Sequence, residues 1–191
     1  MSECKKRIIV GISGASGIIY GVRTLELLKA AGVETHLVVS KAAEMTLAYE
    51  SDLTIKDLRA IADHFHPMVD IGASISSGSF HTLGMIITPC SIRTMSEIAT
   101  GVTGSLMSRA ADVVLKERRR LVLAVRETPL HSGHLRTMLQ LSDMGAVICP
   151  VVPAFYNKPK TLDDIVNHSV GRMLDLFDID TGAVKRWKTG E

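Results

Sequence analysis

The chain has 191 residues, of which 46% are hydrophobic, 22% charged and 4% aromatic, and its formal net charge is +2. This length allows one domain with a sizeable apolar core, and the hydrophobic fraction excludes a disordered protein. The balance of 22 Lys and Arg against 20 Asp and Glu residues excludes a polybasic arm, so we expect no nucleic-acid partner. No apolar run approaches the roughly 20 residues of a membrane span, and residues 1–6 lack the apolar region of a signal peptide.

Cysteine usage and hydropathy indicate the compartment and the assembly. The three cysteines, Cys4, Cys90 and Cys149, are scattered and odd in number, which argues against a disulfide framework. We therefore predict a cytoplasmic location, where thiols stay reduced. The mean hydropathy of +0.22 is high for a protein without a membrane span, and it indicates apolar surface buried between subunits. A homo-oligomer is expected.

Short β-branched runs alternate with helical patterns along the whole chain. The predicted strands are, in order, 7–12, 34–39, 85–88, 121–125 and 146–149, with a weak sixth candidate at 67–70. The predicted helices are 18–31, 41–49, 55–64, 105–116, 132–144 and 162–177. This alternation predicts a three-layer αβα fold, Rossmann-like or flavodoxin-like, with a mostly parallel sheet of five or six strands. We expect a single domain over 1–191, in which 178–191 form a C-terminal tail.

A glycine-rich loop, GISGASG at 11–17, follows the first predicted strand, where ligands bind in folds of this class. Its G-x-x-G-x-x-G spacing departs from the dinucleotide fingerprint, and Ser40 stands where an Asp or Glu would bind the ribose. Ala15 also breaks the G-x-S-x-G pattern of a hydrolase nucleophile. The loop is interpreted as a mononucleotide or flavin phosphate site, or as a turn needed only for packing.

A second strand-to-helix turn, PCSIRT at 89–94, follows the strand 85–88. Ser91 fits either a ligand contact or the N-cap of the next helix. Cys90 is a candidate nucleophile, but the sequence shows no base beside it, and a small buried cysteine explains it as well. The polar loop 74–79 is either a mobile flap or a solvated connection.

Cations on the helix 105–116 form a stripe, because Arg109 and Lys116 are seven residues apart. They are candidates for binding a phosphate. The alternative is a salt ladder, since Asp112 lies within one turn of both.

Three further residues complete the set of candidate phosphate ligands. Arg126 follows the strand 121–125 directly, at the sheet edge where ligands bind. Arg172 shares a helix stripe with apolar residues, which predicts a buried guanidinium with a partner anion. Tyr156 lies in the loop 153–158. Together with the stripe above, these residues predict a second phosphate site, separate from the glycine-rich loop.

Two histidine motifs, 64–66 and 131–134, have spacings that metal ions tolerate. No accompanying carboxylate or cysteine pattern completes a site, so we interpret them as solvated or helix-capping histidines. Asp175, Asp178 and Asp180 indicate Mg²⁺ only weakly. We predict no metal site.

These motifs together resemble the flavin prenyltransferase family, UbiX, within the group of homo-oligomeric flavin-containing cysteine decarboxylases. The resemblance covers nearly the whole chain. The motifs that carry it are GISGASG (11–17), SKAA (40–43), ESD (50–52), SSGSF (76–80), PCSIRT (89–94), RAADVVLKERR (109–119), RETPLH (126–131), PAFYNKP (153–159) and the positions of Arg172 and Trp187.

The resemblance implies that a dimethylallyl group moves from dimethylallyl monophosphate to N5 and C6 of reduced FMN, which closes a fourth ring. The product, prenylated FMN, would serve a UbiD-type decarboxylase. The family is a metal-independent transferase and is typically a dodecamer whose active sites are shared between subunits.

The resemblance also assigns roles to individual residues. The FMN ligands that it implies are Gly14, Ala15, Ser16, Ser40, Ser91, Ile92, Arg93, Thr94 and Arg126. The residues implied for the dimethylallyl phosphate are Tyr156 and Arg172, assisted by Lys116 and Arg109. Glu50 and Ser16 would serve the chemistry near N5, and Glu127 would orient the phosphate site.

Glu50 also stands out from the sequence itself, because it ends the predicted helix that begins after Ser40. A carboxylate at a helix C-terminus faces the negative end of the dipole, which is unfavourable without a compensating role. Either it is an ordinary surface Glu, or it is a base, in competition with the departing phosphate.

Three other functions remain as alternatives. The first is a flavoprotein that oxidatively decarboxylates a cysteine-like thiol. That branch has a P-A-S-A-N turn at the position of PCSIRT, and we cannot place its catalytic His in this chain. An aromatic-acid decarboxylase lacks a residue set that would act on an aromatic carboxylate. A non-catalytic FMN carrier would explain both loops, but not the cations at 109, 116 and 172.

Overall fold

The computed structural model describes residues 6–184. Within them, six strands form one parallel sheet in the order β3-β2-β1-β4-β5-β6. The strands are β1 (Arg7–Ile12), β2 (Glu34–Val39), β3 (His64–His66), β4 (Gly84–Cys90), β5 (Arg120–Val125) and β6 (Val147–Ile148). This is the doubly wound order, and it reverses between β1 and β4, where such folds bind ligands. The predicted fold is confirmed.

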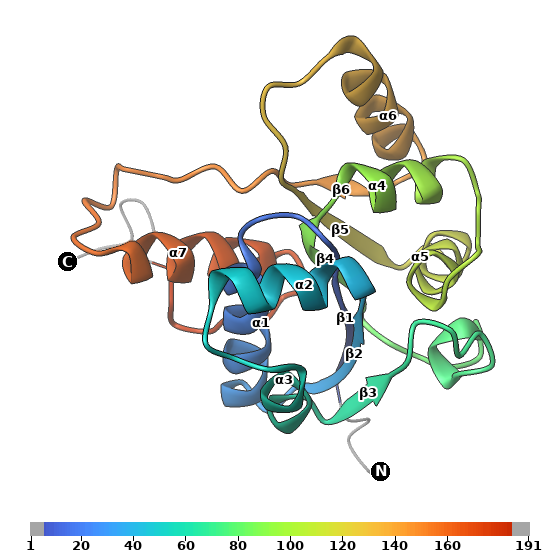
Figure 1. The fold of residues 1–191 in the computed structure, drawn as a ribbon, viewed down its shortest axis with the longest axis horizontal. Coiled ribbons are helices and arrows are strands. Elements are labelled where there is room, and N and C mark those ends of the chain that lie inside the picture. The colour runs from blue at the N-terminus through green and yellow to red at the C-terminus, as the bar shows by residue number, and fades with distance from the viewer. Residues whose placement is uncertain (1–5, 185–191) are drawn as a thin grey trace.

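Seven helices and one 3-10 helix within residues 6–184 cover the sheet. They are α1 (Ile18–Ala30), α2 (Lys41–Glu50), α3 (Ile55–Ile61), the 3-10 helix η1 (Ser74–Ser76), α4 (Ile92–Ala99), α5 (Leu106–Lys116), α6 (Ser132–Asp143) and α7 (Leu162–Asp175). In Figure 1, α1, α3 and α7 lie to the left of the sheet, α2 passes in front of it, and α4, α5 and α6 lie to its right.

Two apolar cores follow from the alternation of side chains along the strands. Ile8, Val10 and Ile12 face the core beneath α1, α3 and α7, whereas Ile9 and Ile87 face the core beneath α4, α5 and η1. Strands buried on both faces read as unbroken apolar runs, which is why their boundaries were predicted well. The observed bounds of β1 and β2 are the predicted ones.

The sixth strand lies elsewhere than predicted. Residues 67–70 form a turn, in which the Asp70 N–H donates to the Pro67 carbonyl at 3.0 Å. The strand is instead His64–His66, and α3 ends at Ile61, before the predicted end of that helix. The cause is a tertiary contact: the Asp63 carboxylate accepts a hydrogen bond from the Thr35 N–H at 2.8 Å. This contact draws the chain alongside β2.

Local residue types explain where two of the helices end or begin. Gly32 follows α1 with φ 68°, a left-handed conformation that glycine adopts at little cost. Thr161 and Asp164 form the capping box at the start of α7. The first part of the predicted tail packs on the domain, because Ile179 belongs to the core. Cys4 and Trp187 lie outside the described residues.

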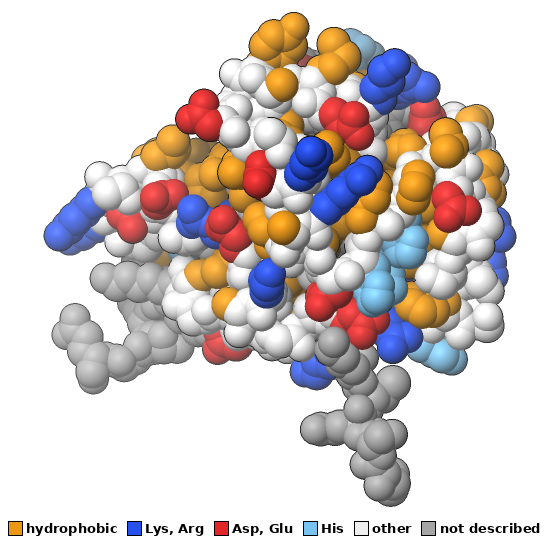
Figure 2. Space-filling view, turned by 60° about the horizontal axis from the view of Figure 1, so that its bottom comes forward, with side chains coloured by type: hydrophobic (Ala, Val, Ile, Leu, Met, Phe, Trp, Pro, Cys, Tyr) orange, Lys and Arg blue, Asp and Glu red, His pale blue; other side chains and the backbone are white. Residues whose placement is uncertain are grey.

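Large apolar side chains also remain at the surface, as the orange patches in Figure 2 show. Four are on or beside α6, and three lie in the loop 149–161. They are Leu130, Leu135, Leu139 and Met144 in the first group, and Val152, Phe155 and Tyr156 in the second. Such apolar surface is typical of subunit interfaces. Among the described helices, none has the length and apolarity to span a membrane.

Candidate functional site

A cleft of about 640 Å³ opens at the carboxyl ends of β1, β2 and β4, at the reversal of strand order. This volume falls within the range typical of small-molecule sites. Seven of the predicted site residues line it: Gly14, Ser40, Ser91, Ile92, Arg93, Thr94 and Glu127. The structure therefore brings the glycine-rich loop and the PCSIRT loop to one cavity.

Glycine is required at position 14 because of a close approach. A Cβ atom on Gly14 would lie 2.3 Å from the Cβ of Ala42, near the start of α2. The loop after β1 is thus pressed against the first turn of α2, whose N-cap Ser40 accepts a hydrogen bond from the Ala43 N–H at 3.1 Å. Gly14 and the first residues of α2 line the same cleft, and the free N–H groups of a helix N-terminus suit an anion such as a flavin phosphate.

Ser13 joins the two loops, a role that the sequence analysis missed. This fully buried hydroxyl donates to the Pro89 carbonyl at 3.0 Å and accepts from the Ser91 N–H at 2.7 Å. Its place inside the glycine-rich motif was the available signal. Ser13 fixes the distance between the loops.

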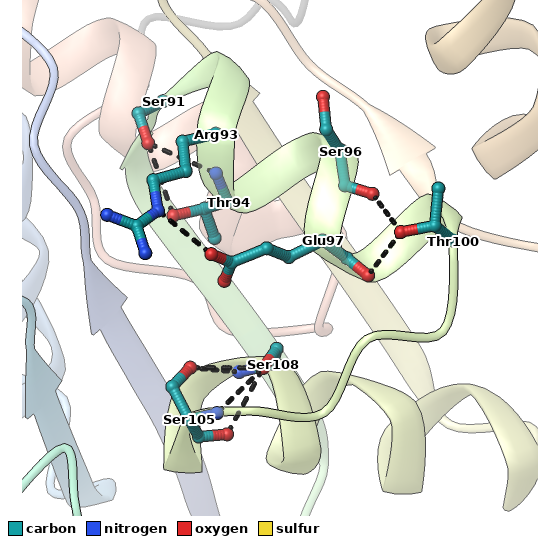
Figure 3. A network of polar contacts seen from close by, with 8 residues as sticks. All are labelled: Ser91, Arg93, Thr94, Ser96, Glu97, Thr100, Ser105 and Ser108. Carbon is teal, nitrogen blue, oxygen red and sulfur yellow. Dashed lines mark hydrogen bonds and ion pairs between the residues drawn. The ribbon is translucent and has the colours of Figure 1, made fainter.

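The α4 N-terminus forms a second wall of the cleft, and Figure 3 shows the hydrogen bonds of its residues. The Ser91 hydroxyl accepts from the Thr94 N–H at 3.3 Å and caps the helix. Arg93 pairs with Glu97 at 2.9 Å, but its side chain is 88% exposed and points away from the core. Ser105, at the start of α5, faces the same space. Two helix N-termini therefore present positive dipole ends to the cleft.

Glu50 is the last residue of α2, but its side chain lies at the start of α1. Its Oε2 accepts hydrogen bonds from the N–H groups of Gly17 and Ile18, both at 2.9 Å. Gly17 has no side chain to cap α1, so Glu50 supplies the cap from another helix. These two hydrogen bonds compensate for the unfavourable position of the Glu50 carboxylate at the C-terminus of α2.

The same contacts set the acidity of Glu50. Partial burial raises the pKa of this carboxyl, but the opposing effects are larger in sum. Hydrogen bonds from the Ser16 side chain and from two backbone N–H groups, with the nearby charge of Arg126, bring the pKa below its usual value. Ser16, Glu50 and Arg126 thus lie close together. None of the three lines the cleft, but Arg126 adjoins the lining residue Glu127 and Ser16 is two residues from the lining residue Gly14, so the group lies at the rim.

Arg126 and Glu127 follow β5 and are exposed. The Arg126 N–H donates to the Cys90 carbonyl at 3.1 Å, which holds this loop beside the PCSIRT loop. Glu127 accepts from the Thr128 N–H at 3.0 Å and lines the cleft. Both lie at the end of the sheet predicted for ligands.

A second, smaller hollow of about 100 Å³ lies between the segment 149–152 and α7. Arg172 and His168 line it, and the Tyr156 hydroxyl lies 2.9 Å from Nε2 of His168. The predicted burial of Arg172 is wrong: its side chain is 53% exposed and pairs with Asp175 at 2.7 Å. The apolar stripe ends at the helix surface, where a guanidinium stays solvated.

Arg109 and Lys116 belong to α5, on the opposite face of the sheet. Arg109 pairs with Asp112 at 2.9 Å, as in the salt-ladder alternative, whereas Lys116 pairs with Glu117 at 2.6 Å. None of the five principal cavities of residues 6–184 is lined by these cations together with Arg172. One chain alone does not assemble the predicted second phosphate site.

The two described cysteines are free, and Cys90 is fully buried. Burial raises the pKa of the Cys90 thiol to about 12, so it stays protonated near neutral pH. The prediction of a small buried cysteine is confirmed, and burial with a raised pKa argues against a nucleophile here.

Of the two histidine motifs, 131–134 is a helix cap as predicted, because His131 is the N-cap of α6 and accepts a hydrogen bond from the Gly133 N–H at 3.0 Å. The motif 64–66 differs, because Glu34 and His36 of β2 accompany His64.

Comparison with known proteins identifies the family. A family model described as Flavoprotein matches residues 1–179. The chain is 57% identical over 185 residues to flavin prenyltransferase UbiX of Thauera aromatica, covering 97% of this chain and 95% of the relative. Identity to flavin prenyltransferase UbiX of Escherichia coli K12 is 61% over 175 residues, or 91% and 93% of the two chains. The chain belongs to the flavin prenyltransferase UbiX family.

Solved structures agree with this UbiX assignment. AnUbiX (PadA1), in complex with FMN and dimethylallyl pyrophosphate, has a TM-score of 0.96 and 52% identity, covering 98% of this chain and all of that one. A dodecameric FMN-dependent UbiX-like decarboxylase from Escherichia coli O157:H7 has a TM-score of 0.92 and 49% identity, covering 95% and 99%. Peptidyl-cysteine decarboxylase EpiD, at 14% identity and a TM-score of 0.61, shares the fold alone. The predicted family and enzyme class, a transferase, are confirmed.

Proposed function

We propose that this UbiX-family chain transfers a dimethylallyl group from dimethylallyl monophosphate to N5 and C6 of reduced FMN. The observation that carries the proposal is the cleft at the reversal of strand order, where the GISGASG and PCSIRT motifs meet. AnUbiX, which holds FMN and dimethylallyl pyrophosphate, supports both ligand classes. The prenylated flavin would be passed to a UbiD-type decarboxylase in the cytoplasm.

The residues around the cleft fit FMN. The close approach at Gly14 leaves backbone rather than side chain facing the ligand, and the α4 N-terminus offers further N–H donors. The residues that would hold FMN are Gly14, Ala15, Ser16, Ser40, Ser91, Ile92, Arg93, Thr94 and Arg126. FMN supplies the electron-rich acceptor ring of the reaction.

Loss of the allylic phosphate leaves a dianion and a carbon with cationic character. Tyr156 and Arg172, with Arg109 and Lys116, would stabilise the dianion by charge and hydrogen bonds, so no metal ion is needed. Because α5 and α7 lie on opposite faces of the sheet, we assign the two pairs to different protomers. The exposed apolar side chains of α6 and of the loop 149–161, and the dodecameric relative, support such an assembly.

Proton transfer near N5 falls to Glu50 and Ser16, which are hydrogen bonded to each other at the rim. Glu127, on the cleft wall, would orient the donor phosphate. We propose these three as the catalytic residues. The single domain over 1–191 remains a prediction.

The mass of the flavin tests the reaction directly. The chain is incubated without oxygen with reduced FMN and dimethylallyl monophosphate, and the flavin is analysed by mass spectrometry. A gain of one C5H8 unit supports the proposal. An unchanged flavin, together with loss of CO₂ from a cysteine-like thiol, would favour the alternative function, decarboxylation of such a thiol.

A further inference from the structure

A cluster of histidines and a glutamate lies at the edge of the sheet, away from the cleft. The register pairs His36 of β2 with His64 of β3, and side chains two residues apart on a strand share a face. Glu34 therefore joins His36, and His66 joins His64, on the same face. In Figure 2, which turns the lower edge of the molecule toward the viewer, histidine side chains gather beside acidic ones.

The donor atoms of this cluster converge. Oε1 of Glu34 lies 3.0 Å from Nε2 of His36 and 3.6 Å from Nε2 of His64, and the three donor atoms all lie within 4.8 Å of one another. Metal–ligand distances of about 2.0–2.2 Å in a tetrahedral zinc site place neighbouring ligand atoms about 3.3–3.6 Å apart. The Glu34–His64 separation of 3.6 Å falls in this range, and the Glu34–His36 separation of 3.0 Å is slightly shorter.

The surrounding residues hold Glu34 and His36 in place, whereas the side chain of His64 is free to adjust. His36 is 3% exposed, its Nδ1 lies 3.0 Å from Nε2 of His66, and the edge of Phe80 packs on its ring. The Glu34 side chain is 12% exposed, whereas that of His64 is 53% exposed. A metal ion can therefore enter from the His64 side.

One cation already shares the carboxylate. Nε of Arg7 lies 3.4 Å from Oε1 of Glu34, and its guanidinium lies over the Phe80 ring. Arg7 partly neutralises Glu34 when no metal ion is bound, and it would compete with one. Its removal is expected to strengthen metal binding.

We propose that Glu34, His36 and His64 bind one divalent first-row transition metal ion, with water as the fourth ligand. Two imidazoles and one carboxylate suit Zn²⁺, Ni²⁺ or Cu²⁺, whereas Mg²⁺ and Ca²⁺ prefer oxygen ligands alone. His66 would hold the ring of His36 in place through the contact between Nε2 of His66 and Nδ1 of His36. The ion would fasten the three-residue edge strand β3 to β2.

This site is separate from the proposed reaction. Glu34 and His36 of β2 precede Ser40 by six and four residues, so at about 3.3 Å per residue they lie roughly 13–20 Å from the cleft-lining Ser40. Metal binding is therefore expected to change stability and not prenyl transfer.

Calorimetric titration of the untagged, metal-stripped full chain with Zn²⁺ tests the proposal, above the ordinary imidazole pKa of about 6.5. We expect one equivalent of Zn²⁺ to bind, a rise in melting temperature with Zn²⁺, and no binding of Mg²⁺. His64→Ala should weaken binding at least tenfold and abolish the rise. His81→Ala, which removes an exposed histidine outside the cluster, is the matched control and should bind as the parent does. Arg7→Gln should bind more tightly.

Two results would overturn the site. One is equal Zn²⁺ binding by the parent and by His64→Ala, and the other is equal loss in His64→Ala and His81→Ala. Since His64 is half exposed, its alanine variant should keep the fold, and circular dichroism of each variant checks this. Glu34→Gln, which keeps the shape of the side chain but removes its charge, must weaken binding as well.

Discussion

Glu50 shows how a single residue can combine structure and chemistry. Its carboxylate caps α1 from the end of α2 and lies beside Ser16 and Arg126. Glu50→Gln keeps an acceptor for the α1 N–H groups but cannot take a proton. FMN should still bind, while ring closure slows by roughly 10²–10⁴-fold. Anaerobic single-turnover measurements of flavin mass check this.

Glu44→Gln is the matched control for that variant, because Glu44 is an exposed glutamate of the same helix. It should react as the parent does. Turnover of Glu50→Gln within a few-fold of the parent would remove Glu50 as the base and favour the departing phosphate.

Variants of Arg172 and Arg126 can show whether the phosphates of FMN and of the dimethylallyl donor bind at different places. Arg172 lines the hollow beside α7, and Arg126 lies at the rim of the cleft. Arg172→Ala should abolish prenyl transfer with little effect on FMN binding. Arg126→Ala should weaken FMN binding first, by about tenfold or more, since a charge-assisted hydrogen bond contributes roughly 1.5–3 kcal/mol. Fluorescence titration with FMN measures both, and loss of FMN from Arg172→Ala would contradict the partition.

At the scale of elements, the junction of α1 and α2 should be sensitive to pH. A carboxyl group whose pKa is lowered by folding stabilises the folded state above its unfolded pKa of about 4.3. That contribution is lost as the pH falls through the lower, folded value. The stability difference between the parent and Glu50→Gln should therefore be largest near neutral pH and shrink in acid. Urea unfolding over a pH series measures it, and a difference independent of pH would contradict the carboxylate cap.

The sequence predicted long elements and loop motifs well, because apolar runs and glycine spacing are local signals. It failed where a contact between distant residues decides the outcome. Asp63 reaches Thr35 and so creates β3, which is too short to show an alternating pattern. Glu50 reaches the start of α1, and nothing local to the ESD motif indicates that partner.

The same limit applied to the candidate sites. The residues of the first site come from loops at one end of the sheet, so topology alone brought them together. The second set, Arg109, Lys116, Tyr156 and Arg172, was grouped because each side chain can bind a phosphate. The sheet separates these residues within one chain, which charge patterns cannot reveal.

At the scale of the whole molecule, a shared site predicts complementation. Arg172→Ala and Lys116→Ala should each be inactive alone. Coexpressed as mixed oligomers, they should regain about a quarter of the parent activity, because each site draws two chains at random and needs an intact residue from each. Activity of the purified mixture, compared with each variant expressed alone, measures this. Failure to regain activity in verified mixed oligomers would show that the site is not shared in this way.

Metal removal is the second test at this scale. Prenyl transfer should survive exhaustive EDTA treatment, because cationic side chains are proposed to stabilise the departing phosphate. If a metal ion is bound at Glu34, His36 and His64, its removal by EDTA should lower the melting temperature and leave prenyl transfer unchanged. Inhibition that is rescued by Mg²⁺ would contradict this and would direct attention to Asp175 and its acidic neighbours.

The Ser13 bridge bears on the order in which the two ligands can bind. Because this hydroxyl ties the loops after β1 and β4 together, the flavin cleft is preorganised within one chain, and little conformational entropy remains to be lost there on binding. The allyl phosphate, by contrast, would meet its full set of cations only after chains associate. A newly folded protomer would thus be ready for its acceptor before it is ready for its donor, so the reactive allyl phosphate is engaged only in a complete assembly.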